Sequence, residues 1–160
     1  MIEIQRADLS TPEHAAAVTR LLDAYASDEM GGGSGLSDFT KEHLASTLHK
    51  RPQTYVFLAY EDEAAVGLSI CFESFSTFEC RPILNIHDVF VAAEFRGREI
   101  AQGMLAAIES LAGELDCCKL SLEVLEGNRR AESLYRRFGF AGYELDPALG
   151  RALFYEKKLS

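Results

Sequence analysis

One stretch near the middle of the chain changes from a strand pattern to a helix pattern across a single short turn. Apolar and β-branched residues dominate Ile83–Val91, which predicts a strand. After the turn, apolar residues recur at the spacing of one helical face, which predicts a buried helix; they are Ile100, Met104, Leu105, Ile108, Leu111, Ala112 and Leu115. A helix start leaves backbone N–H groups unpaired, and with the helix dipole these attract phosphate. Arg96 and Arg98 in the turn favour the same ligand, because guanidinium groups pair well with phosphate oxygens.

This turn resembles motif A of the GNAT superfamily, the N-acetyltransferases that use acetyl-CoA. The family's pyrophosphate loop reads Arg/Gln-x-x-Gly-x-Gly/Ala, and here it reads Arg96-Gly97-Arg98-Glu99-Ile100-Ala101. Glu99 departs from the motif, because a glycine at this place lets the backbone approach the pyrophosphate closely. Two interpretations stay open: an acid in the first helical turn, where it suits the dipole, or a charge that weakens acetyl-CoA binding. The resemblance implies an acetyl-CoA site formed by Arg96, Gly97, Arg98, Glu99, Ile100, Ala101 and Gln102.

A second segment, from Leu120 to Phe140, resembles motif B of the same family. The matching residues are Asn128, Ala131, Tyr135, Gly139 and Phe140. Asn128 and Tyr135 are two helical turns apart, so a helix places them on nearly the same face. The resemblance implies that Asn128 hydrogen-bonds the pantetheine arm or the phosphates of CoA, with Ala131 beside it, and that Tyr135 protonates the leaving thiolate. The alternative is that Tyr135 is a core aromatic residue and Asn128 only a helix N-cap.

The resemblance also implies a binding role for the backbone of the central strand. In the family this strand separates from the next strand at a bulge, and its free backbone groups pair with pantetheine. By position this role falls to Val89, Phe90 and Val91. The three residues can equally be ordinary core strand residues, and both interpretations are compatible because the role depends on the backbone.

Acetyl transfer to an amine needs a neutral nucleophile, a base that takes its proton, and a group that polarises the thioester carbonyl. The candidates are His87 and Asp88 on the central strand, with Glu73 and Glu123 on the neighbouring strands. Adjacent strand residues face opposite ways, so only one of His87 and Asp88 points at the acceptor unless a bulge intervenes.

The run from His87 to Val91 is similar to the Glu-Asp-Leu-Tyr/Phe-Val of diamine and polyamine acetyltransferases, in which the acidic pair contacts the amine. We therefore interpret Asp88 as the acceptor contact and His87 as a base. The alternative for His87 is a buried histidine bonded to backbone. Glu73 and Glu123 are alternates, or simply solvated strand charges.

A glycine-rich segment, Gly31-Gly32-Gly33-Ser34-Gly35, lies between the first two predicted helices. It is not a P-loop, because it lacks the Gly-Lys-Ser/Thr ending and no strand precedes it. It is either a hinge between two helices or, as the resemblance suggests, a lid in which Gly32 and Gly33 border the acceptor.

The remaining pattern predicts one α/β domain over residues 1–160, with a central mixed sheet of six to seven strands flanked by helices on both faces. The resemblance implies that this is the GNAT fold. The other predicted strands are Ile2–Arg6, Thr54–Tyr60, Val66–Phe75, Lys119–Leu125, Phe140–Leu145 and Ala152–Lys158, and the other helices start after Ser10, cover Asp38–Lys50 and include Ala131–Phe138.

Composition narrows the function. The net charge of −9 argues against a nucleic-acid partner, and no apolar run is long enough to cross a membrane. The chain start does not resemble a signal peptide, so we expect a cytoplasmic protein. The four cysteines lack zinc-ligand spacing, so we expect reduced thiols and no metal. The expected partner is an amine acceptor, and dimers are common among relatives. The alternative to an enzyme is a GNAT-fold ligand-binding or interaction protein that binds acetyl-CoA weakly because of Glu99.

Overall fold

A computed structural model describes residues 1–159 of the chain. These residues fall into two compact units, Met1–Leu125 and the part that begins at Glu126. The sequence predicted one domain across the whole chain, and this stays a prediction. Nearly all predicted elements of the first unit are present, and the differences concentrate in the second.

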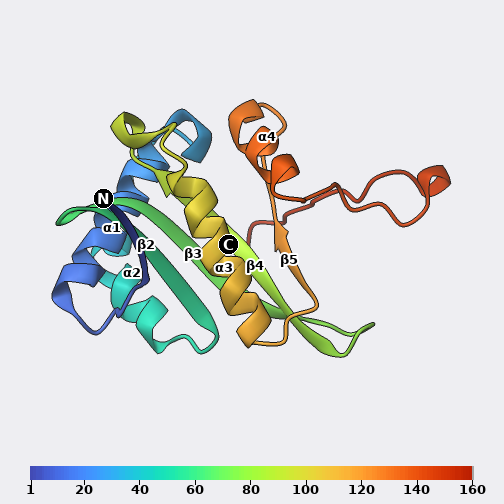
Figure 1. Cartoon of the computed structure of the whole chain (residues 1–160), viewed down its shortest axis with the longest axis horizontal. Coiled ribbons are helices and arrows are strands. Elements are labelled where there is room, and N and C mark those ends of the chain that lie inside the picture. The colour runs from blue at the N-terminus through green and yellow to red at the C-terminus, as the bar shows by residue number, and fades with distance from the viewer. Residues whose placement is uncertain (160) are drawn as a thin grey trace. The chain divides into compact units, whose positions relative to one another are not determined.

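The first unit is built on a mixed sheet that has five strands among the residues described. Their order along the sheet follows the chain: β1 (Ile2–Arg6), β2 (Thr54–Glu61), β3 (Ala64–Ser76), β4 (Arg81–Val91) and β5 (Lys119–Leu122). The first four strands are antiparallel to their neighbours, and β5 runs parallel to β4 (Figure 1). This parallel pair requires a crossover, which α3 (Ile100–Glu114) provides. The predicted fold class is confirmed.

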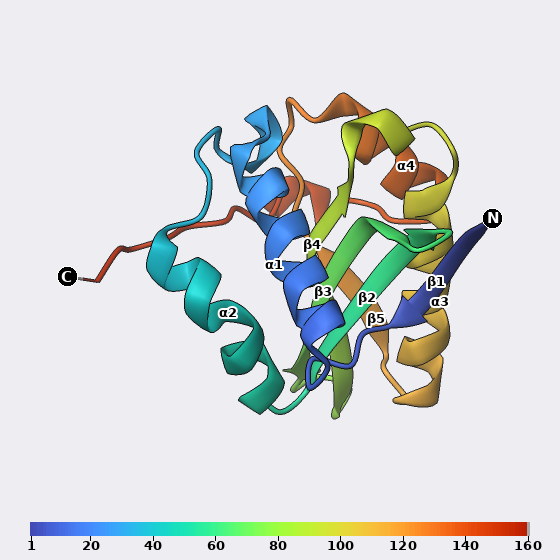
Figure 2. The ribbon, with the colours of Figure 1, turned by 90° about the vertical axis from the view of Figure 1, so that its left-hand side faces the viewer.

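Helices cover both faces of this sheet. Helices α1 (Pro12–Ser27) and α2 (Asp38–Lys50) lie on one face and α3 on the other (Figure 2). The start of α1 is set by local chemistry, because the Thr11 side chain accepts a hydrogen bond from the His14 N–H and Pro12 occupies the first turn. Ser37 caps α2 in the same way. The first face is called the α1–α2 face below, and the second the α3 face.

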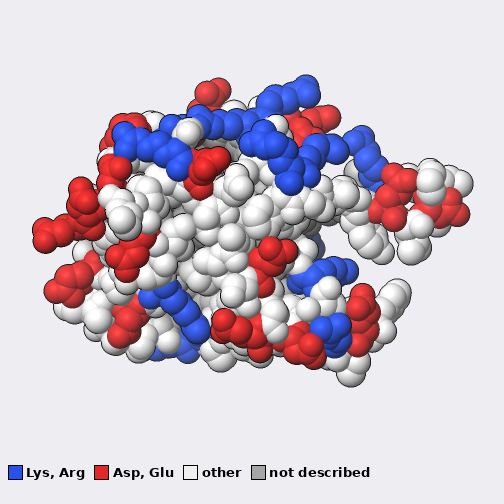
Figure 3. All heavy atoms as spheres, viewed as in Figure 1, with Lys and Arg blue, Asp and Glu red and all other residues white. Residues whose placement is uncertain are grey.

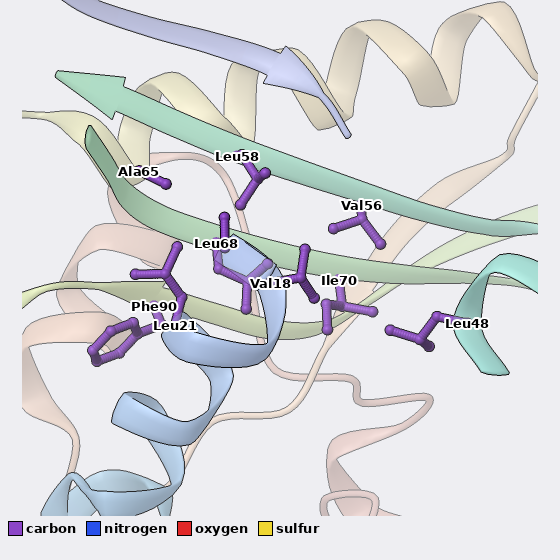
Figure 4. Packing of buried hydrophobic residues seen from close by; sticks show 10 residues of the cluster. Val18, Leu21, Leu48, Val56, Leu58, Ala65, Leu68, Ile70 and Phe90 are labelled. Atoms are coloured by element: carbon purple, nitrogen blue, oxygen red, sulfur yellow. The ribbon is translucent and has the colours of Figure 1, made fainter. Parts of the chain in front are cut away.

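Two apolar clusters hold the layers together. On the α1–α2 face, Val18 and Leu21 of α1 point toward Leu58 and Leu68 of the sheet, and all four side chains are fully buried (Figure 4). On the α3 face, the buried members are Ala59, Val66, Ile100 and Met104. Burial of such side chains stabilises a fold by about 1.5–3 kcal/mol each. Helix α3, which follows the turn that carries Arg96 and Arg98, is therefore anchored in the core at its first residue, Ile100.

The second unit contains one α-helix, α4 (Arg129–Arg137), among its described residues. The two strands predicted at Phe140–Leu145 and Ala152–Lys158 are wrong: the two segments meet at one isolated bridge, Glu144 to Arg151, and a 3₁₀ turn (Pro147–Leu149) lies between them. Their aromatic residues favour extended backbone, but the segments contain no β-branched residue, and a strand needs a partner along its length. The sheet therefore has five strands rather than the six or seven expected.

Candidate active site

A β-bulge interrupts the central strand at His87. In the ladder between β3 and β4, Ile70 pairs with Asp88, whereas the next residue, Cys71, pairs with Ile86. His87 is the extra residue on β4, with no partner of its own in this register. Extra residues of this kind bend a strand and re-aim its side chains.

The bulge turns His87 and Asp88 to the same side of the sheet. Phe90 belongs to the cluster on the α1–α2 face, and Asp88, two residues earlier, shares that face. The His87 ring packs edge-on against Phe72, with ring centroids 5.3 Å apart, and Phe72 packs against the same cluster. The sequence allowed both side chains on one face only if a bulge intervened, and the bulge is present.

Asp88 is partly buried, and its surroundings favour the neutral acid. Burial raises the pKa of Asp88, while the nearby His87 lowers it. The backbone carbonyl of Asp88 accepts a hydrogen bond from the hydroxyl of Ser69, at 2.8 Å, and Ser69 is fully buried. This bond ties the bulged part of β4 to β3.

Tyr25 of α1 is a member of this group that the sequence did not indicate. The Tyr25 ring lies 5.6 Å from that of Phe90, and burial first, then the charges of Asp88 and Asp28, raise the pKa of its hydroxyl. No sequence signal could have placed Tyr25 near Asp88, because α1 and β4 are far apart in the chain and meet only in the folded structure.

Burial makes Cys71, which lies near this group, and Cys117, which lies near Glu73, neutral thiols. Cys71 is fully buried, and burial raises its pKa to about 12, with a smaller contribution from Asp88. Burial also raises the pKa of Cys117. Neither thiol is set up as a nucleophile, since the thiolate is the reactive form. All four cysteines are free, as predicted.

Among the residues that the structure describes, the edge of β4 that faces β5 has no strand partner after the bulge. The parallel ladder covers Ile83–Ile86 of β4 and Lys119–Leu122 of β5, and it ends there. Strand β4 continues to Val91, paired only with β3. Residues Val89, Phe90 and Val91, predicted to offer backbone groups to a ligand, therefore lie where the two strands have separated. An unpaired strand edge is a template for an extended ligand.

The turn after β4 has the geometry of an anion site. A 3₁₀ turn, η2 (Ala93–Phe95), leads into Gly97, which has a left-handed φ of 89°. Helix α3 then begins at Ile100, and its first-turn N–H groups, at Ile100, Ala101 and Gln102, have no partner within the helix.

Glu99 is the N-cap of α3, not a residue of its first turn as one interpretation expected. Its φ of 61° and ψ of 12° are left-handed, and its side chain makes no capping hydrogen bond. Left-handed backbone costs an ordinary residue about 1–2 kcal/mol and glycine almost nothing. The glycine of the motif therefore suits the left-handed backbone at this position. In this chain a glutamate adopts the same backbone conformation, at the cost of strain.

Both arginines of the turn are already engaged. Arg96 donates to a carboxylate oxygen of Asp28 at 2.7 Å and to the carbonyl of Val91 at 2.9 Å. Arg98 donates to the carboxylate of Glu61 at 2.7 Å. The cationic groups are thus held beside the helix start, and each retains donors for a further anion.

The other predicted acceptor residues lie elsewhere. Glu73 is on the α3 face of β3, where it accepts hydrogen bonds from Gln53 and Tyr55. The structure does not bring it together with Asp88. Glu123 is exposed and follows the last residue of β5, at the point where β5 leaves β4. Gly32 and Gly33 lie in the loop between α1 and α2 and have left-handed φ angles of 114° and 78°.

In the second unit, Asn128 is the N-cap of α4, and its side chain accepts a hydrogen bond from the Ala131 N–H at 3.2 Å. Tyr135 packs edge-on against Phe140, with ring centroids 5.9 Å apart. Asn128 is therefore a helix N-cap, as one interpretation expected, whereas Tyr135 is only partly buried, in a helix that has no buried residue, and is not a core residue. Neither finding conflicts with a role in binding, which stays a prediction.

Within residues 1–159, no group of three or more acidic, histidine or cysteine side chains is arranged to hold a metal ion. The helices of this part of the chain are also too short or too polar to cross a membrane.

Comparison with known proteins agrees with this geometry. Residues 18–140 match the acetyltransferase (GNAT) family. A thialysine N-epsilon-acetyltransferase from Bos taurus is 34% identical over 74 residues, which cover 46% of this chain and 43% of that protein, so the chain spans less than half of that relative's length. An aminoglycoside N(6')-acetyltransferase from Salmonella enteritidis is 22% identical over 98% of this chain and 99% of its own length.

Among solved structures, a probable acetyltransferase superimposes with a TM-score of 0.79 at 22% identity, covering 99% of this chain and 98% of that one. The extent of the family match, together with the named relatives, supports the family and the general activity. The chain belongs to the GNAT family and is an acetyl-CoA-dependent N-acetyltransferase.

Proposed function

We propose that this enzyme transfers the acetyl group of acetyl-CoA to a primary amine of a small cationic molecule, by direct attack of the amine on the thioester. The observation that carries the proposal is the bulge at His87. It supports an amine site at His87 and Asp88 on one face, next to the free edge of β4 where an extended cofactor arm can pair.

The residues present fit acetyl-CoA. The first-turn N–H groups of α3 suit the pyrophosphate, and Arg96 and Arg98 supply positive charge beside them. The free edge at Val89–Val91 suits the amide groups of pantetheine. Acetyl-CoA supplies the activated acyl group. The strained Glu99 is the one residue whose charge opposes the pyrophosphate.

The acceptor side suits a cation. Asp88 offers a carboxylate, and the rings of Tyr25, Phe72 and His87 lie around its strand, a setting in which ammonium groups bind well. The net charge of −9 does not favour a nucleic-acid partner, and acidic side chains are spread over the face of the molecule shown in Figure 3. The aminoglycoside and thialysine relatives are named for small amines, and we extend that class of acceptor to this chain.

In this proposal Asp88 and His87 handle the proton. An ammonium must lose a proton before it can attack, and a carboxylate with a raised pKa is a better base than an exposed one. Asp88 binds the ammonium and accepts its proton, directly or through His87. Because Cys71 is a buried neutral thiol, no acyl-enzyme step is proposed.

Residues of the second unit complete the proposal on the basis of the family motif. Asn128 binds the pantetheine arm or the phosphates, with Ala131 beside it, and Tyr135 protonates the leaving thiolate. Tyr135→Phe keeps the ring and removes the proton, so it tests this role separately from packing against Phe140. A cytoplasmic location and a homodimer are further proposals, and light scattering of the purified protein measures the second.

The first experiment is calorimetric titration with acetyl-CoA, with desulfo-CoA as the control, followed by acetylation of a panel of amines. We expect micromolar binding and acetylation of aminoglycosides, polyamines or lysine analogues. No binding at millimolar acetyl-CoA would overturn the proposal and favour a GNAT-fold ligand-binding protein. Binding of acetyl-CoA with acetylation only of protein N-termini would overturn the small-molecule acceptor alone.

A further inference from the structure

Asp28 connects two loops that are far apart in the chain. It ends α1 and begins the loop to α2, where its side chain accepts a hydrogen bond from the Met30 N–H at 3.0 Å. Its backbone carbonyl accepts from the N–H groups of Gly31 at 2.9 Å and Gly33 at 3.0 Å. One residue thus organises the short 3₁₀ turn η1 (Glu29–Gly31) and the glycines that follow it.

The same carboxylate binds Arg96 of the turn before α3. The guanidinium is fixed by three contacts: Asp28 at 2.7 Å, the Val91 carbonyl at 2.9 Å, and the ring of Phe90, whose centroid is 5.7 Å away. The Asp28 and Arg96 side chains are 26% and 33% exposed. An ion pair shielded to this degree is stronger than one in open solvent. Arg96 accordingly lowers the pKa of Asp28, its hydrogen bond being the largest cause.

The loop that Asp28 holds also contacts the backbone of Tyr25, whose ring belongs to the acceptor group. A Cβ at Gly31 would lie 1.9 Å from the carbonyl oxygen of Tyr25, so the turn is packed directly on the end of α1. Tyr25 in turn packs on Phe90, close to Asp88. A shift of the loop therefore displaces the end of α1 and Tyr25, next to the place proposed for the amine.

We infer that Asp28 is a positioning residue that couples acetyl-CoA binding to the loop between α1 and α2. The inference rests on the proposed function. The pyrophosphate binds the remaining donors of the Arg96 guanidinium and competes with Asp28 for its positive charge, so acetyl-CoA binding weakens the ion pair and loosens the loop for arrival of the acceptor. By linkage, an acceptor that binds better to the loosened loop must strengthen acetyl-CoA binding by the same factor.

A second ion pair on the same turn provides a matched control. Glu61, at the end of β2, pairs with Arg98 just as Asp28 pairs with Arg96, at the same 2.7 Å. Glu61 has no hydrogen bond or ion pair with the α1–α2 loop among the contacts of residues 1–159. Removing either carboxylate relieves competition for an arginine of the turn before α3. Only Asp28 also links that arginine to the loop between α1 and α2.

The experiment compares wild type, Asp28→Asn and Glu61→Gln. Asparagine is as good an N-cap as aspartate, so Asp28→Asn removes the charge and keeps an oxygen for the Met30 N–H. Acetyl-CoA affinity is measured by calorimetry, and exchange of the Gly31 and Gly33 amides by hydrogen–deuterium exchange, with and without acetyl-CoA. Arg96→Gln breaks the same pair from the other side and serves as the second variant.

We expect Asp28→Asn and Glu61→Gln, which each remove a carboxylate, to bind acetyl-CoA about fivefold more tightly than wild type. In wild type, acetyl-CoA should speed exchange of the two glycine amides about fivefold. In Asp28→Asn and Arg96→Gln these amides should exchange fast from the start and respond no further, whereas Glu61→Gln should behave as wild type in this measurement.

Amides that exchange at the wild-type rate in Asp28→Asn, or that are slowed by acetyl-CoA in wild type, would overturn the coupling while leaving the enzyme assignment intact. If wild type fails to bind acetyl-CoA, the proposed function falls and the coupling with it.

Discussion

Strand β4 and the C-terminal segment from Phe140 were both predicted to be extended, and they have opposite outcomes. Strand β4 carries the β-branched residues Ile83, Ile86, Val89 and Val91, whereas the C-terminal segment has aromatic residues but no valine, isoleucine or threonine. Strand β4 is paired along its length by β3 and in part by β5, whereas the C-terminal segment has one bridge, between Glu144 and Arg151. The difference shows that strand propensity prepares a segment for pairing, and that a sheet position with free partners decides whether a strand forms.

The largest effect is expected for a proline in β4. Leu84 is fully buried and is paired on both sides, with Glu73 and with Leu120. Leu84→Pro removes a ladder donor and a core side chain together, so we expect a loss of more than about 3 kcal/mol in the free energy of unfolding. Urea unfolding followed by circular dichroism measures it, and a loss below 1 kcal/mol would contradict the central place given to β4.

A substitution at the bulge should separate function from stability. Asp88→Asn removes the proposed base, so we expect kcat to fall by about a hundredfold or more. Because the pKa of Asp88 is raised in the folded state, its ionisation lowers stability as the pH rises from the ordinary aspartate pKa through the raised one. Above that range the asparagine variant should be the more stable protein.

The same group predicts the pH dependence of activity. The rate should rise with pH as Asp88 loses its proton, over a range above the ordinary aspartate pKa, and this limb should be absent in Asp88→Asn. Steady-state rates with a reactive amine, together with thermal unfolding at several pH values, test both statements. An unchanged kcat would assign the base elsewhere.

A smaller gain is expected at the helix start. Glu99 occupies a left-handed N-cap, so Glu99→Gly should raise the free energy of unfolding by about 1 kcal/mol. It also removes a negative charge from the anion site, so acetyl-CoA affinity should rise severalfold. Glu99→Gln is the control, because it removes the charge and keeps the strain. A gain in affinity with glycine alone would assign the effect to backbone geometry.

The smallest effect is expected in the C-terminal segment. Phe154 lies outside any strand or helix, so Phe154→Pro removes no strand hydrogen bond in this structure. We expect the free energy of unfolding to change by less than about 0.5 kcal/mol. A loss comparable to that of Leu84→Pro would show that the segment does pair in solution, for example in an oligomer.

Sequence patterns predicted the elements of the first unit because each has local determinants. The cap at Thr11, the apolar stripe of α3 and the hairpin turn between β2 and β3 all act over a few residues. The anion-binding turn was likewise predictable from Arg96 and Arg98, since a strand, a turn and a helix start are consecutive in the chain. The role of Tyr25 beside Asp88 was not predictable, because it depends on which helix covers which strand.

The sequence by itself determined the fold class, the family, and the residues that can bind an anion or accept a proton. The tertiary structure alone decided that His87 is the extra residue of a bulge, that His87 and Asp88 both lie on the α1–α2 face, and that Asp28 reaches Arg96. The reason is physical: periodicity and caps arise from neighbours in the chain, whereas strand register, the face of a side chain and an ion pair between loops arise only when distant segments meet.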